Sequence, residues 1–476
     1  MTASTRIEHD LLGDRAVPRD AYYGVHTLRA LENFPITGTS ISIYPDLVAA
    51  LACVKQAAAM ANGELGLLDE ARAQAIGRAC EEVRGGELLE EFVVDVIQGG
   101  AGTSTNMNAN EVICNRALEL MGHSKGEYAR LHPLDHVNMS QSTNDVYPTA
   151  VKLALQTGIR RLLHEMHGLR LAFEAKSAEF GDVLKVGRTQ LQDAVPMTLG
   201  QEFSTYAVMM GEDESRLAEA AALVREINLG ATAIGTGINA DPRYAALVTQ
   251  RLSEISGYEF VVSPNLIEAT QDAGAFVQLS GVLKRVAVKL SKVCNDLRLL
   301  SSGPRAGLGE ITLPAVQAGS SIMPGKVNPV IPEMMNQIAF EAIGNDITVT
   351  LAAEAGQLQL NAFEPIIAHS LFKSLNHLGA GCRTLAERCV RGISANRERA
   401  RRLLDESTAL VTALNPVIGY TRASEVAQAA LASGRRVDDL VLERGWLSRA
   451  QLDDLLRPEA LAGPQASTGR GRGSGR

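Results

Sequence analysis

The sequence predicts a mainly α-helical protein built around a bundle of long helices. Apolar residues recur with helical spacing over about 148–180, a span well beyond an ordinary globular helix. Similar patterns cover roughly 199–228, 272–301, 332–355 and 364–403, and no comparable set of alternating strands competes with them. Because each such helix must bury its apolar stripe, we expect a bundle that continues across subunits.

The pattern changes at two points along the chain, which predicts three domains and a tail. We expect an N-terminal domain at 1–143, with short helices and glycine-rich loops, and a central long-helix bundle at 144–403. A small C-terminal helical domain follows at 404–462. The segment 463–476 has too few apolar residues to fold, so we expect a disordered tail there. Its glycines and arginines resemble those of RNA-binding tails, but a short solvated tail is the favoured interpretation.

Composition excludes several classes of protein. The 476-residue chain carries a formal net charge of −8, which argues against a nucleic-acid or membrane-surface partner. Its six cysteines are scattered without a C-x-x-C pair, which is typical of reduced thiols rather than disulfides or a zinc site. No long uncharged apolar run is present, and the first residues carry charges where a signal peptide needs an apolar stretch. We therefore expect a cytoplasmic protein without a membrane partner.

Two short motifs suggest a ligand but do not fit one. In "AGSSIMPGKVNPVIP" (318–332), five residues separate Gly319 from Gly325, and a valine follows Lys326. A phosphate-binding loop needs four residues there and a hydroxyl after the lysine. In "HEMH" the imidazoles of His164 and His167 have a spacing that can bind metal, but no third ligand is evident. The sequence therefore predicts no nucleotide-binding site, no metal site and no cofactor.

Four loops between the helical patterns are rich in small polar side chains. Serine, threonine and asparagine often cap helices, and the stretch 142–145 is a good cap before a long helix. Caps alone do not explain so many donors, whereas neutral donors with one lysine, at helix N-termini, suit a small dianion such as a dicarboxylate. The candidate residues are Thr103, Ser142, Thr143, Asn144, Thr189, Ser320, Ser321, Lys326 and Asn328.

These loops carry a resemblance to a known family. The stretch "GSSIMPGKVNP" resembles the signature loop of the fumarase/aspartase superfamily, and the resemblance extends over roughly residues 5 to 461. Gln190 stands where fumarases carry a histidine, so no histidine base is available at that position. Four stretches resemble the aspartase branch more than the fumarase branch, namely "DAYYGVHT" (20–27), "NMSQSTND" (138–145), "GRTQLQDAVPMTLGQEF" (187–203) and "KVNPVIPE" (326–333).

The resemblance implies a fold, an assembly and a reaction. It implies three domains around a long-helix bundle, a homotetramer, and active sites formed by loops of three subunits. The implied reaction is reversible deamination of L-aspartate to fumarate and ammonia, by removal of a Cβ proton through an enediolate. It implies no cofactor, although a divalent cation such as Mg²⁺ activates some members. A fumarate hydratase, a lyase for a larger amine and a catalytically silent structural homologue remain alternatives.

The resemblance also implies a role for each candidate residue. Proton removal needs a base, and the enediolate needs preorganised donors around the β-carboxylate. Ser320 is the implied base, on a loop that closes over the substrate, with its pKa depressed by neighbouring donors. Lys326 pairs with the α-carboxylate, together with Ser321 and Asn328, and Asn144 contacts the amino group. The implied β-carboxylate donors are Thr103, Ser142, Thr143 and Thr189.

Overall fold

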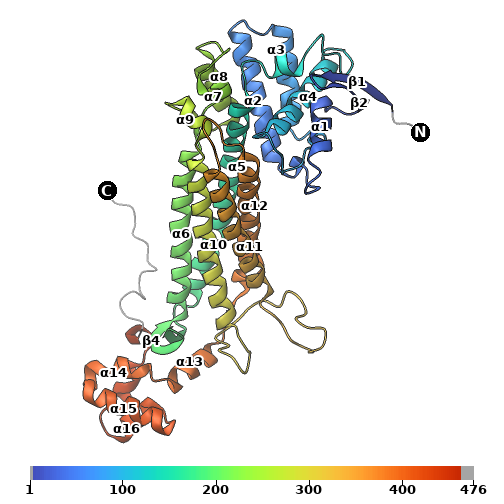
Figure 1. Cartoon of the computed structure of the whole chain (residues 1–476). Helices are drawn as coiled ribbons and strands as arrows, with labels where there is room; N and C mark the ends of the chain where they lie inside the picture. Colours follow the sequence, from blue (N-terminus) through green and yellow to red (C-terminus); the bar gives the residue numbers. More distant parts are fainter. Residues whose placement is uncertain (1–3, 462–476) are drawn as a thin grey trace. The chain divides into compact units, whose positions relative to one another are not determined.

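The computed structural model describes residues 4–461 and confirms a mainly helical protein (Figure 1). The predicted tail at 463–476 lies outside the described residues. The chain divides into two compact units. Unit 1 comprises Met1–Leu163, Ser215–Arg285 and Glu341–His377, and unit 2 comprises His164–Glu214, Val286–Phe340 and Leu378–Arg476. This division does not test the domain boundaries predicted at 143 and 403, which stay predictions.

The N-terminal part of unit 1 contains a β-hairpin and helices longer than the sequence pattern suggested. Strand β1 pairs antiparallel with β2, and α2 packs with α3 and with α8 (Tyr244–Ser256). Short 3₁₀ turns lie at Ile41–Ile43 and Leu89–Glu91, and a π-helical turn lies at Pro133–Val137. The elements are β1 (Thr5–Asp10), β2 (Gly13–Pro18), α1 (Val25–Asn33), α2 (Pro45–Glu64), α3 (Glu70–Arg84) and α4 (Thr103–Leu120).

Five long helices form the bundle, close to where the sequence predicts them (Figure 1). They are α5 (Thr143–Glu179), α6 (Leu199–Leu223), α10 (Gly274–Leu300), α11 (Val330–Glu354) and α12 (Glu364–Arg388). In unit 1, Ser280 of α10 donates a hydrogen bond to Asp346 of α11 at 2.8 Å. In unit 2, Asn336 of α11 donates to Ser291 of α10, also at 2.8 Å. Helices α10 and α11 are therefore hydrogen-bonded to each other within each unit.

Helix α5 begins five residues before the predicted start at Pro148. A proline inside a helix has no N–H to donate to the carbonyl four residues earlier, which here belongs to Asn144. That carbonyl instead accepts a hydrogen bond from Asn228 Nδ2 at 3.0 Å. A side chain from a distant segment therefore replaces the missing donor, and the helix continues through the proline.

The single helix predicted over 364–403 is wrong, because α12 ends at Arg388. The chain then forms a 3₁₀ turn and strand β8 (Ser394–Ala395), which pairs antiparallel with β7 (Ile311–Thr312), before α13 (Arg397–Glu406) begins. Asn396 Nδ2 also donates to the carbonyl of Gly309 at 2.8 Å. Long-range pairing thus replaces helical hydrogen bonds that the local pattern alone would have favoured.

Shorter elements complete both units. A hairpin of β3 (Leu184–Thr189) and β4 (Gln192–Thr198) shares an apolar core with the C-terminal helices, where small helical pieces were predicted. Those helices are α14 (Leu410–Ile418), α15 (Tyr420–Ser433), α16 (Val437–Glu443), α17 (Arg449–Leu455) and α18 (Pro458–Leu461). Unit 1 also holds β5 (Glu226–Ile227), α7 (Thr232–Gly235), α8 (Tyr244–Ser256), β6 (Val261–Val262) and α9 (Leu266–Gln271).

Candidate active site

Three of the predicted residues lie at the N-terminus of α5 in unit 1. Ser142 Oγ accepts a hydrogen bond from the Asn144 N–H at 3.2 Å, and Asp145 Oδ1 accepts one from the Ser142 N–H at 3.1 Å. Ser142 therefore caps the start of α5, so the cap predicted within 142–145 is confirmed. These bonds hold half-buried Ser142, Thr143 and Asn144 at the positive end of a 37-residue helix.

Thr103 lies at the N-terminus of α4, also in unit 1. Its side chain is exposed, and its hydroxyl donates to the Gly100 carbonyl at 2.7 Å. The preceding Gly102 has φ +90°, and a Cβ added there would lie 2.3 Å from Cγ of the Tyr147 ring on α5. Only glycine allows this close approach. The start of α4 is thereby fixed against α5, close to the Thr143 end.

A buried polar network supports Thr143. Asn106 Nδ2 donates to Thr143 Oγ1 at 3.0 Å and to Asn138 Oδ1 at 3.2 Å. Lys55 Nζ donates to the same Asn138 oxygen at 2.8 Å and to Gln141 Oε1 at 2.9 Å. Because the Thr143 oxygen already accepts from an amide, its hydroxyl hydrogen is left to donate to an anion.

Two ionisable groups of this network are fully buried. Burial lowers the pKa of Lys55 to about 7, against an opposing effect of the Asp145 carboxylate. Burial likewise raises the pKa of Asp145 to about 7, although this carboxyl accepts hydrogen bonds from the N–H groups of Ser142 and Thr232. The helix N-terminus that presents Thr143 is therefore supported by fully buried, hydrogen-bonded side chains.

Asn144 has one end of its amide already engaged. Its Nδ2 donates to the Ala233 carbonyl at 2.7 Å, which fixes the orientation of the side chain. The carbonyl oxygen, Oδ1, is the atom that can accept a hydrogen bond from an ammonium group. The geometry is therefore compatible with the predicted contact to a substrate amino group.

Thr189 lies in unit 2, at the end of β3, and its side chain is exposed. The two following residues, Gln190 and Leu191, have φ of 54° and 62° and form the tight turn to β4. Next to the threonine, Arg188 Nη1 contacts Glu310 Oε1 at 2.7 Å, and Glu310 is completely buried. Glu310 precedes β7 directly, so one buried ion pair connects the Thr189 hairpin to the segment that leads into the Ser320 loop.

The remaining candidates share an exposed loop of unit 2 that is closed on itself. The Gly319 N–H donates to the Lys326 carbonyl at 2.8 Å, and Asn328 Nδ2 donates back to the Gly319 carbonyl at 2.8 Å. A Cβ at Gly319 would lie 2.5 Å from the Lys326 oxygen, so this position requires glycine. We call residues 319–328 the closed loop.

Ser320 occupies a specific position inside the closed loop. Its Oγ accepts hydrogen bonds from the N–H groups of Met323 at 2.9 Å and Ile322 at 3.2 Å. Two N–H donors on one oxygen favour its ionised form, which is what a serine base requires. Ser321 and Lys326 are exposed, and within residues 4–461 the Lys326 ammonium forms no ion pair. A cation without a partner is available to a carboxylate.

The structure thus places the candidates in two groups. Unit 1 holds Thr103, Ser142, Thr143 and Asn144, and unit 2 holds Thr189, Ser320, Ser321, Lys326 and Asn328. The sequence pattern did not reveal the supporting residues Lys55, Asn138 and Gln141. The available signal was Lys55 itself, the one charged residue in the apolar stretch 47–61. Unit 1 contributes neutral donors, and unit 2 contributes a cation and a serine oxygen among N–H groups; these are the kinds of group that elimination from a carboxylate substrate requires.

Comparison with known proteins places the chain among the lyases. A family model described as "Lyase" matches residues 13–344, and one described as "Fumarase C C-terminus" matches residues 410–463. The chain belongs to the fumarase/aspartase superfamily of lyases.

Individual relatives align over almost their full lengths. The chain is 62% identical to an aspartate ammonia-lyase of Pseudomonas fluorescens over 464 residues, 97% of each chain. It is 54% identical to that of Escherichia coli K12, covering 98% of this chain and 97% of the relative. A solved structure described as fumarate lyase:delta crystallin from Brucella melitensis, bound to cobalt, is 58% identical with a TM-score of 0.95. The match covers 97% of this chain and 100% of that chain. A class II fumarase from Schistosoma mansoni is 35% identical with TM-score 0.92, at the same coverage.

Two features are absent from residues 4–461. They contain no group of three or more histidine, cysteine or acidic residues placed to hold a metal ion. Within the same residues, none of the helices combines the length and apolar character needed to cross a membrane.

Proposed function

We propose that this protein catalyses the reversible deamination of L-aspartate to fumarate and ammonia. The observation that carries the proposal is the 54–62% identity, over nearly the whole chain, to several proteins named aspartate ammonia-lyase. The lyase family matches and the donor-rich loops support the same reaction. The substrate is a small dicarboxylate that carries an amino group.

In the proposed mechanism, Ser320 removes the Cβ proton of aspartate. The proton moves to Oγ, and the electron pair of the C–H bond moves into the β-carboxylate to form an enediolate. The N–H groups of Ile322 and Met323, at 3.2 and 2.9 Å from Oγ, support this role because they stabilise the serine oxyanion that accepts the proton. The enediolate then expels ammonia from Cα, which leaves fumarate.

The hydroxyls of Thr103, Ser142, Thr143 and Thr189 donate to the β-carboxylate in this proposal. Three of them lie at the N-termini of α4 and α5, where the helix dipole favours negative charge. Lys326 pairs with the α-carboxylate, and Ser321 and Asn328 orient it. Asn144 Oδ1 accepts from the substrate ammonium. The charge on the β-carboxylate grows during the reaction, so donors held in place beforehand lower the barrier most.

We further propose that the active protein is a homotetramer with sites completed by three subunits. Apolar side chains on one face of α11 support an assembly, because Phe340, Ile347 and Leu351 are 63%, 59% and 63% exposed. Ile322 on the closed loop is 84% exposed, which also suits burial against substrate or another subunit. If Ser320 and Thr143 of one site come from different chains, mixed Ser320→Ala and Thr143→Ala tetramers regain partial activity after joint refolding. Absence of complementation at every subunit ratio would show that each site belongs to one chain.

The reaction as proposed uses no cofactor, and a divalent cation such as Mg²⁺ acts only as an activator. Activity measured after chelation and after Mg²⁺ addition tests this directly. Residual turnover in the chelated protein is expected, and complete loss would make the metal essential. The cytoplasm is the proposed location, supported by six free and buried cysteines.

The decisive test is the choice of substrate. Fumarate formation, followed by its ultraviolet absorbance, is expected to be far faster from aspartate than from malate. An equal or higher malate rate would favour a fumarate hydratase, in line with the Schistosoma mansoni relative, which is named a class II fumarase. Inactivity with both substrates would favour the silent structural homologue.

A further inference from the structure

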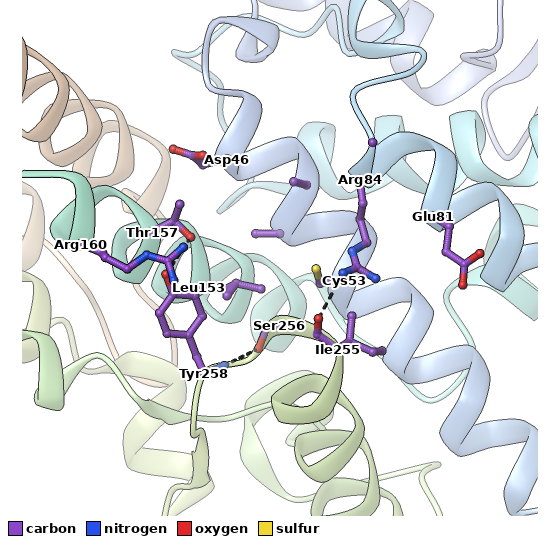
Figure 2. A pocket seen from close by; sticks show the side chains of 13 residues that line it. Asp46, Cys53, Glu81, Arg84, Leu153, Thr157, Arg160, Ile255, Ser256 and Tyr258 are labelled. Atoms are coloured by element: carbon purple, nitrogen blue, oxygen red, sulfur yellow. Dashed lines mark hydrogen bonds between the residues drawn. The ribbon is translucent and has the colours of Figure 1, made fainter. Parts of the chain in front are cut away.

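A cavity of about 440 Å³ lies in unit 1 between α2, α3, α5 and α8 (Figure 2). It shares no lining residue with the candidate active site. Its lining includes two arginines, Arg84 at the end of α3 and Arg160 on α5. The segment from Ile255 to Tyr258, at the end of α8, lies between them (Figure 2). Two guanidinium groups therefore face one cavity.

Arg160 is exposed and has no carboxylate partner among residues 4–461. Its guanidinium carbon lies 5.2 Å from the centre of the Tyr258 ring. Arginine stacks on aromatic faces in this way, and stacking leaves the N–H edge of the guanidinium open. That edge matches the two oxygens of a carboxylate.

Arg84 is half-buried and bonds only to neutral acceptors within the described residues. Its Nη1 donates to Gln56 Oε1 at 2.7 Å, and its Nη2 donates to the Ile255 carbonyl at 3.1 Å. These two bonds fix the guanidinium without neutralising it. Three of the five N–H groups of an arginine remain after two are used.

The acidic residues of the lining do not serve as partners for these arginines. Asp46 is engaged by Arg161, a residue outside the lining of this cavity, with one contact at 3.0 Å. Glu81 accepts a hydrogen bond from Gln56 Nε2 at 3.0 Å. The cavity therefore presents two fixed cations, with hydroxyls of Thr157 and Ser256 beside them.

We propose that this cavity is a second ligand site, which binds a small organic dianion with one carboxylate on each arginine. Arg84 and Arg160 reach the cavity from opposite sides, as Figure 2 shows. Separated cations suit a ligand with two separated charges better than one compact oxyanion. The hydroxyls and the Tyr258 ring then contact the carbon chain between the two carboxylates.

Calorimetric titration of the full-length protein with succinate tests the proposal. The titration uses Lys326→Ala, which weakens binding at the candidate active site, and compares it with Lys326→Ala combined with Arg160→Ala. The added substitution is expected to weaken succinate binding about tenfold or more, because it removes charge-assisted hydrogen bonds. Arg160 is exposed, so its replacement leaves the fold intact.

Arg216→Ala in the same Lys326→Ala background is the matched control. It removes one exposed cation of α6 that lies outside the cavity, and succinate binding is expected to stay unchanged. Equal weakening by Arg216→Ala and Arg160→Ala would overturn the proposal, because net charge alone would then explain the loss. Unchanged binding in both Arg160→Ala and Arg84→Gln would also overturn it. Inorganic phosphate binding more tightly than succinate would overturn the dicarboxylate class.

Discussion

The two groups of candidate residues are built in opposite ways. In unit 1, Asn106 donates a hydrogen bond to Thr143, and both Asn106 and Lys55 donate to Asn138 in a network beneath it. In unit 2, Ser320 belongs to an exposed loop, and the hydrogen bonds of its oxygen come from backbone groups of the same loop. The proposed carboxylate donor Thr143 is thus fixed by the protein core, whereas the proposed base depends on its own segment for support.

This contrast suits the chemistry. Anion-binding donors lower a barrier most when they need no reorganisation during the reaction. A base on an exposed loop can leave the site open for substrate entry and complete it afterwards. The same contrast predicts which substitutions damage catalysis and which damage stability.

The largest effect is expected for Ser320→Ala. Loss of a general base typically lowers turnover by about 10²–10⁴-fold. Stability is expected to stay unchanged, since the loop is exposed and only two N–H groups lose an acceptor. Fumarate production and thermal unfolding measure the two quantities. Retention of more than about a tenth of the activity would mean that another residue is the base.

A pair of lysine substitutions tests the contrast in stability. Lys55→Met leaves the Gln141 oxygen without its donor and removes one of the donors to the Asn138 oxygen, at a cost of about 2 kcal/mol. Lys326→Met, at an exposed position, is expected to change the free energy of unfolding by less than about 0.5 kcal/mol while strongly reducing activity. Denaturant titration of each variant measures the free energy of unfolding and so compares the two. Equal stability of the two variants would show that the network under Thr143 does not support the fold.

Buried carboxyl groups make unit 1 sensitive to pH. Burial raises the pKa of Glu364 to about 8 from 4.5, against an opposing effect of Lys152. The folded state holds this proton more tightly, so its contribution is fully present below pH 4.5 and is lost as the pH rises through about 8. Glu364→Gln mimics the protonated form, and its stability is expected to fall less than that of the natural protein between about pH 5 and 8.5. If the melting temperatures of the two proteins changed with pH in the same way across that range, the argument from burial of Glu364 would be contradicted.

The smallest effect is expected for Ile322→Ser in the closed loop. The side chain is 84% exposed, so the free energy of unfolding is expected to change by less than about 0.5 kcal/mol. A loss above about 1 kcal/mol, measured in the assembled protein, would show that the loop is permanently buried against another subunit. The loop would then not be free to open.

The sequence predicted the bundle well because periodicity reports which helix face is buried. It placed the start of α6 at residue 199 and a helix cap within 142–145, where Ser142 caps α5. It failed at Arg388, where pairing of β7 with β8 ends the helix, and at Pro148, where Asn228 replaces a missing donor. Both errors come from partners far away in the chain, which no local pattern contains.

The sequence indicated the candidate polar residues in the loops. It did not indicate the residues that hydrogen-bond to them and hold them in place. The hydroxyls, Lys326 and Asn328 were visible as polar residues in loops, and the family resemblance suggested their roles. The bond from Asn106 to Thr143 joins α4 to α5, and the ion pair of Arg188 with Glu310 joins positions 122 residues apart. Such contacts depend on how helices and hairpins pack, so the structure was needed to find them.

The closed loop has a consequence for how this chain tolerates change. Its conformation is set by bonds between Gly319, Lys326 and Asn328, all within ten residues, rather than by the segments that tether it. Lengthening the tether at 313–318 would alter the reach of the loop while preserving the surroundings of Ser320. A single residue inserted between Gly319 and Lys326 would destroy those surroundings without touching the rest of the molecule. The reach and the reactivity of the serine can thus be varied independently, by insertion in one place or the other.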